Sequence, residues 1–167
     1  MRCFIAAWPD PPTSVALAAL SADVRERVAH RRATRIEDLH LTLAFIGNLD
    51  DADAFAVADA ITKFKFRTFS WRLDTLGFFD DAGVVWVGAA GEPVNPLVAL
   101  AERARAVLDR FDLHYDRRPL APHVTLLRGV QRFSVERVAP IVWRIDSVAL
   151  YRSVPTDEAT RYARVVR

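Results

Sequence analysis

Hydrophobic residues follow two different spacings along the first part of this chain, and each spacing predicts a type of element. The run Arg2–Trp8 is apolar and short, as in a buried strand. Apolar residues then recur every three or four positions, as on one face of a helix, at Leu17, Leu20, Val24 and Val28. A second apolar run covers Leu39–Ile46. The chain is therefore expected to begin as strand, helix, strand.

A second helix and a hairpin are predicted next. Asp50 and Asp51 are residue types that cap helix N-termini, and the helical spacing after them carries Val57, Ile61 and Phe64. Apolar and polar residues alternate over 69–74, as in a half-buried strand. The polar segment 80–83 separates this strand from the apolar run 84–87, so the two strands are expected to form a hairpin.

The pattern of apolar residues in the second half of the chain predicts one more helix and three strands. Helical spacing recurs at Leu97, Leu100, Ala104, Leu108 and Phe111. Strands are predicted at His123–Arg128, Ile141–Tyr151 and Arg161–Val166, with a polar loop over Pro155–Glu158. Regular alternation of strand and helix fails after about residue 65, which favours an α+β fold with mainly antiparallel sheet over a doubly wound one.

Composition narrows this picture without changing it. With 167 residues, 51% of them hydrophobic, the chain is expected to form one domain, 1–167, with its own core. The lone Cys3 cannot form an internal disulfide, which favours a cytoplasmic setting. No apolar run is long enough to cross a membrane. The net charge of +2 does not require a nucleic-acid partner, although nearly all the cations are arginines, which suit phosphate.

A short motif occurs twice. His40-Leu41-Thr42-Leu43 and His123-Val124-Thr125-Leu126 lie 83 residues apart, each in a run with strand character. Residues two apart on a strand share a face, so each histidine and its threonine are expected to point the same way while the apolar residues enter the core. If the two strands face each other, two imidazoles and two hydroxyls converge on one small volume.

Two histidines and two threonines suit displacement at phosphorus. The reaction needs a base on the attacking oxygen and an acid on the leaving oxygen, and histidine serves both roles near neutral pH. The hydroxyls of Thr42 and Thr125 are candidates to bind the phosphate oxygens between them. No cofactor or metal is expected, because neither repeat carries the further ligands that zinc needs. His30 and His114 have no matching motif and are predicted to be structural.

These motifs resemble the two-histidine phosphoesterase superfamily, and within it the RNA 2′,3′-cyclic phosphodiesterases, also called 2′-5′ RNA ligases. The resemblance covers essentially the whole chain, at Arg2–Ala6, Leu39–Gly47, Val84–Gly88, Pro122–Arg128 and Leu150–Ser153. It departs in small ways: Leu120 stands where a phenylalanine is common, and Ile46 where a leucine is.

The resemblance implies a bilobal, pseudo-two-fold fold in which each lobe brings one H-x-T strand to a central cleft. It also implies that His40 is the proton donor and His123 the proton acceptor in opening a 2′,3′-cyclic phosphate on an RNA end. Arg128 resembles a phosphate-binding residue of the family, although on an ideal strand it would face away from Thr125, so a bend is required. Phe4, Phe45 and Tyr151 are candidates to stack a nucleobase.

Alternatives remain from the sequence. The same site could act on 2′-5′ oligonucleotides or small cyclic nucleotides, or the chain could be a non-catalytic RNA-binding module. Ligase activity by the reverse reaction would need no ATP motif, and none is present. The expected partners are RNA ends or nucleotides with a cyclic phosphate, no membrane is expected, and the chain is expected to be a monomer.

Overall fold

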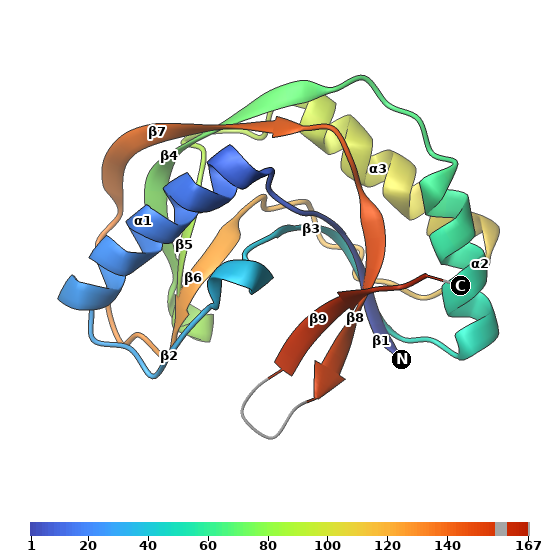
Figure 1. The fold of residues 1–167 in the computed structure, drawn as a ribbon, viewed down its shortest axis with the longest axis horizontal. Helices are drawn as coiled ribbons and strands as arrows, with labels where there is room; N and C mark the ends of the chain where they lie inside the picture. Colours follow the sequence, from blue (N-terminus) through green and yellow to red (C-terminus); the bar gives the residue numbers. More distant parts are fainter. Residues whose placement is uncertain (156–159, 167) are drawn as a thin grey trace.

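The computed structural model describes residues 1–155 and 160–166, which form two antiparallel sheets with helices against them (Figure 1). The loop predicted over Pro155–Glu158 lies, beyond Pro155 itself, outside the described residues. The first sheet has the strand order β3-β1-β8-β9. Its strands are β1 (Arg2–Ala7), β3 (Leu41–Asn48), β8 (Ala149–Pro155) and β9 (Thr160–Arg164).

The second sheet has the order β2-β6-β5-β4-β7. Its strands are β2 (Arg32–Ala33), β4 (Phe69–Phe79), β5 (Val84–Gly88), β6 (Val124–Arg128) and β7 (Glu136–Ile145). The predicted hairpin is β4 with β5, joined by the short 3₁₀ helix Asp80–Ala82 and by Gly83, whose φ of 60° suits glycine. The α+β, mainly antiparallel architecture expected from the sequence is confirmed.

Two of the three helices in the described residues, α1 (Pro11–Arg27) and α3 (Asn95–Arg110), cross from one sheet to the other. Helix α1 follows β1 of the first sheet but packs against β7 of the second. Helix α3 follows β5 of the second sheet but packs against β3 of the first, and α2 (Asp51–Thr62) packs against β8. Each half of the chain therefore supports the other half's sheet.

Local signals set the helix ends. The predicted cap at Asp50 is confirmed, because its side chain accepts a hydrogen bond from the Asp53 backbone N–H. Asp10 caps α1 in the same way, and prolines follow it at the first helical positions. A backbone N–H at these positions has no acceptor within the helix, so its absence in proline costs no hydrogen bond. Val28, Phe64 and Phe111 were predicted on helices but lie just beyond the ends of α1, α2 and α3, respectively.

The single strand predicted over Ile141–Tyr151 is wrong. The structure has two strands there, β7 and β8, which belong to different sheets and are separated by residues 146–148. The apolar run hid the break, because β7 pairs with Trp71 and its neighbours in one sheet while β8 pairs with β1 in the other. The short polar pair Asp146-Ser147 marks the crossing.

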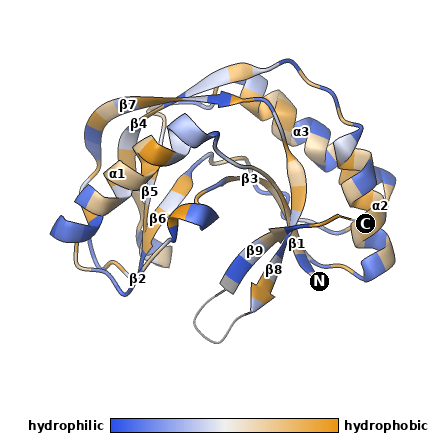
Figure 2. Ribbon diagram, viewed as in Figure 1, coloured by the Kyte–Doolittle hydropathy of each residue, from blue (hydrophilic) through white to orange (hydrophobic). Residues whose placement is uncertain are grey.

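A continuous core lies between the sheets and the helices, and its largest fully buried side chains include Trp71 and Trp143. In Figure 2, hydrophobic and hydrophilic residues alternate along α2 and α3, as expected for helices with one side against a sheet. Within the described part of the chain, every helix is too short or too polar to cross a lipid bilayer.

Candidate active site

Both repeated histidines stand immediately before a strand rather than in it. β3 begins at Leu41 and β6 at Val124, so the predicted strands began too early. Pairing of β3 with β1 ends at Ala7 opposite Leu41, since β1 runs into Trp8 and Pro9. The apolar residues between the motif positions enter the core as predicted: Leu41, Leu43, Val124 and Leu126 are all buried.

The two imidazoles are held by the same hydrogen bond. His40 Nδ1 lies 2.7 Å from the Asp38 carbonyl oxygen, and His123 Nδ1 lies 2.7 Å from the Ala121 carbonyl oxygen. A carbonyl only accepts, so each Nδ1 carries a proton and donates. In the neutral state each Nε2 is then free of a proton, and Nε2 is the nitrogen left for chemistry.

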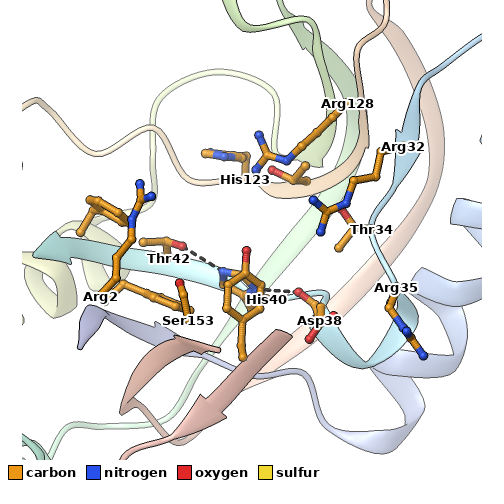
Figure 3. A pocket seen from close by; sticks show the side chains of 14 residues that line it. Arg2, Arg32, Thr34, Arg35, Asp38, His40, Thr42, His123, Arg128 and Ser153 are labelled. Carbon is orange, nitrogen blue, oxygen red and sulfur yellow. Dashed lines mark hydrogen bonds between the residues drawn. The ribbon is translucent and has the colours of Figure 1, made fainter. Parts of the chain in front are cut away.

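His40, Thr42, His123 and Thr125 all line one cavity of about 370 Å³ (Figure 3). The Thr42 hydroxyl lies 3.1 Å from His40 Nε2, close enough to donate a hydrogen bond to the neutral ring. This is the convergence that the repeated motif predicted. Thr42 and Thr125 are partly exposed to the cavity, so their hydroxyls are available to an anion bound there.

A β-bulge in each motif strand turns the residue three positions after the threonine toward the cavity. In β6, Thr125 pairs with Trp86 and Leu127 with Val85, so Leu126 is an extra residue in the ladder. Leu126 and Leu127 are consequently both buried, and Arg128 lines the same cavity as Thr125. This bulge is the bend that the sequence required for Arg128 to face the same cavity as Thr125.

The matching bulge in β3 acts on Phe45. Thr42 pairs with Ala6 and Ala44 with Ile5, which leaves Leu43 as the extra residue. Phe45 is 37% exposed and lines the cavity, with the Arg2 guanidinium 5.0 Å from its ring centroid. The two bulges fall at the same position of the repeat.

Aromatic rings surround His40. The Trp8 ring is stacked on it with centroids 4.6 Å apart, and Phe4 and Tyr162 lie at 5.1 Å and 5.0 Å. Burial among these rings lowers the pKa of His40 from its usual value to about 4, because it disfavours the charged form. His123 and Arg128 lower this pKa further, and the Asp38 carbonyl partly opposes the shift.

His123 lies against the β4–β5 hairpin. The Phe79 ring contacts the His123 ring edge-on, with centroids 4.9 Å apart, and the centroid of the Trp86 ring lies 6.4 Å from that of His123. Burial and the positive charge of Arg128 lower the pKa of His123, although its bond to Ala121 works the other way. Both imidazoles are thus biased toward the neutral form in the free site.

The remaining residues predicted for the site divide into two groups. Phe4 and Phe45 line the cavity, whereas Tyr151 does not and instead stacks on Trp8 at 4.0 Å. The sequence reasoning missed several lining residues: Arg2, Arg32, Thr34, Arg35, Asp38, Ser153 and Tyr162. Alternation along Arg2–Trp8 carried a signal for Arg2, because Arg2 shares a face with Phe4.

The charges at the cavity are mainly positive. Arg2, Arg32, Arg35 and Arg128 line it, and the one carboxylate among the described lining residues, Asp38, is paired with Arg161 at 3.3 Å. Within residues 1–155 and 160–166, no three His, Cys, Asp or Glu side chains are grouped as metal ligands. The cavity is therefore suited to an anion of nucleotide size, and its two Nε2 atoms are suited to moving protons.

Two sheets that each bring a histidine and a threonine to one shared cavity define a two-histidine phosphoesterase. Comparison with known families gives the more particular assignment. Residues 9–157 match the model of the 2′-5′ RNA ligase superfamily, and the chain belongs to that family.

Relatives and solved structures agree with this assignment. The chain is 29% identical over 160 residues to the RNA 2′,3′-cyclic phosphodiesterase of Escherichia coli, covering 89% of this chain and 90% of that one. A protein of the same name from Geobacillus stearothermophilus is 29% identical over 166 residues, which cover 90% of this chain and 51% of that one. The structure of E. coli LigT complexed with 3′-AMP is 25% identical, with a TM-score of 0.84 over 99% of this chain and 95% of that chain.

Proposed function

We propose that this chain hydrolyses 2′,3′-cyclic phosphates on RNA ends to 2′-phosphomonoesters, with His40 and His123 as a metal-independent acid/base pair. The observation that carries the proposal is the convergence of both histidines and both threonines of the repeat on one cavity. The names of the relatives agree with it, since those proteins are called RNA 2′,3′-cyclic phosphodiesterases.

The proposed reaction is an in-line displacement at phosphorus. His123 Nε2 takes a proton from water as the water oxygen attacks the phosphorus atom. The bond from phosphorus to the ribose 3′ oxygen breaks, and His40 Nε2 gives its proton to that oxygen. The products are a 2′-phosphomonoester and a free 3′ hydroxyl, and proton exchange with solvent restores the pair. A 5′ hydroxyl in place of water would give 2′-5′ ligation.

The other lining groups would bind the substrate. The hydroxyls of Thr42 and Thr125 donate hydrogen bonds to the non-bridging oxygens, and Arg128 offers a guanidinium that matches phosphate geometry. Phe4 and Phe45 supply apolar surface for a nucleobase. Tyr151, also a candidate from the sequence, would act indirectly by supporting Trp8.

We further propose that residues 1–167 act as one domain and as a monomer. Both sheets draw strands from both halves of the chain, so neither half forms a sheet by itself. A cytoplasmic location fits the buried thiol of Cys3, which has no disulfide partner in the chain.

The test is hydrolysis of a short RNA with a terminal 2′,3′-cyclic phosphate in excess EDTA, with the phosphate position of the product identified. His40→Ala and His123→Ala should each lower kcat about 10²- to 10⁴-fold. His30→Ala is the matched control, because His30 Nδ1 lies 2.8 Å from the Val28 carbonyl oxygen in the same local arrangement but outside this cavity. A wild type that binds the RNA without hydrolysing it would contradict the proposal and favour 2′-5′ oligonucleotides, small cyclic nucleotides or a binding module.

A second substrate separates the roles of the two histidines. When sulfur replaces the ribose 3′ oxygen, the leaving thiolate needs no proton, so His40→Ala should recover most of its lost rate. His123→Ala should recover little, because water still needs its base. The reverse pattern would exchange the two roles.

A further inference from the structure

The cavity has two unlike ends, with the histidines between them (Figure 3). At one end, Arg2 lies over the Phe45 ring and makes a flat surface. The opposite end is lined by Arg32, Thr34 and Arg35. An aromatic end suits a nucleobase and a cationic end suits a phosphate.

Arg32 is held directly beside Arg128. The two residues are Cα partners on the antiparallel strands β2 and β6, so their side chains share a face. Backbone hydrogen bonds fix β2 on both sides of the pair, from Arg31 N–H to the Arg128 carbonyl oxygen at 3.0 Å and from Thr34 N–H to the Leu126 carbonyl oxygen at 2.8 Å. The position of Arg32 is therefore set by the sheet rather than by a loose loop.

The pair of arginines lacks a compensating charge. Neither Arg32 nor Arg128 forms an ion pair with any carboxylate among residues 1–155 and 160–166. Like charges directly opposite each other on a sheet are destabilising, and an anion offsets that cost. The cyclic phosphate carries one negative charge and already has Arg128 and two threonines. Arg32 is thus an exposed guanidinium beside this site that remains available to a second anion.

We propose that Arg32, with Thr34 and Arg35, binds the phosphodiester on the 5′ side of the terminal nucleotide, which makes the site selective for chain ends over free cyclic mononucleotides. This inference rests on the proposed function. On a ribose, the base is attached to C1′, which is next to C2′, and the 5′ carbon is attached to C4′, which is next to C3′. The base and the 5′ chain therefore extend from opposite sides of the cyclic phosphate. The two unlike ends of the cavity match these two directions.

The test uses product analogues that are not turned over, adenosine 2′-monophosphate and adenosine 2′,5′-bisphosphate, with affinities measured by calorimetry at low salt. Wild type should bind the bisphosphate about tenfold more tightly, which is the gain expected for one charge-assisted contact. Arg32→Ala should bring the ratio close to one, and Arg32→Lys should restore part of it. Arg144→Ala, which removes an exposed arginine of β7 outside the cavity, should keep the wild-type ratio.

Two results would overturn the inference. Equal wild-type affinity for the two ligands would mean that no second phosphate is bound. An equal loss for both ligands in Arg32→Ala, in a variant with a wild-type circular dichroism spectrum, would mean that Arg32 binds the reacting phosphate. Hydrolysis of an oligonucleotide with a terminal 2′,3′-cyclic phosphate by the wild type, measured in parallel, separates these failures from failure of the proposed function, which would abolish turnover of that oligonucleotide.

Discussion

Phe45 and Arg128 occupy matching positions in the two repeats, each three residues after the threonine and each turned into the cavity by a bulge. The two repeats therefore contribute the same histidine and threonine to the site but differ in the residue three positions after the threonine. One repeat offers an aromatic ring and the other a guanidinium. This difference gives the substrate a direction, because a base and a phosphate cannot exchange ends.

Arg128→Ala is expected to lower kcat/KM for a cyclic phosphate about 10- to 100-fold, since a charge-assisted contact to phosphate is lost. Arg128→Lys should recover part of the loss, because lysine keeps the charge but not the planar fork. Steady-state kinetics with Arg144→Ala as control measures both effects. Wild-type kinetics in Arg128→Ala would show that the bulge does not serve phosphate binding.

The two threonines should differ in one respect. Thr125→Val and Thr42→Val each remove a phosphate donor and are expected to lower kcat about tenfold or more, whereas serine variants retain most of it. Only Thr42 is hydrogen-bonded to its histidine, so only Thr42→Val should also change the pKa of its neighbouring imidazole, His40. NMR titration of the histidine rings measures this, and identical shifts in both valine variants would contradict it.

The optimum of kcat/KM is expected below pH 6.5. Catalysis needs one imidazole protonated and the other neutral, so the profile is bell-shaped with one limb at each pKa. Burial places the pKa of His40 at about 4 and lowers that of His123 from its usual 6.5. Activity should therefore fall as pH rises past the higher of the two values. An optimum above pH 7, measured at constant ionic strength, would show that these pKa values are not the ones that govern turnover.

Gly77 should tolerate no side chain while Trp86 is present. A Cβ built on Gly77 would lie 2.1 Å from the Trp86 ring, which itself lies near His123. Gly77→Ala is expected to destabilise the fold by about 1–3 kcal/mol through overpacking and to lower activity by moving the rings behind His123. Thermal unfolding measures the cost. Adding Trp86→Phe should relieve much of it, and simple additivity of the two substitutions would contradict this account.

Sequence reasoning predicted most of the strands and all three helices because each of these segments carries its own hydrophobic period. It failed where the information is not local. In the run Ile141–Tyr151, only the short polar pair Asp146-Ser147 marks the crossing, yet the two parts pair with strands that are distant in sequence. Strand β2 has only two residues, which is too short for a hydrophobic period to be detected.

The same limit applied to the candidate site. The repeated tetrad was visible because its chemistry is contained in four residues. Arg32 and Arg2 reach the cavity through pairing with Arg128 and with β3, and such pairing is a property of the sheets. The bulge that turns Arg128 inward changes no residue type, so the sequence indicated only that some bend was required.

The exchange of helices between the sheets limits how this molecule can be divided. α1 and β2 belong to the first half of the chain but complete the second sheet, while β8 and β9 belong to the second half but complete the first sheet. A fragment cut between the repeats would lose the support of its own histidine-bearing strand. A shorter chain with one repeat could build this cavity only as two intertwined copies.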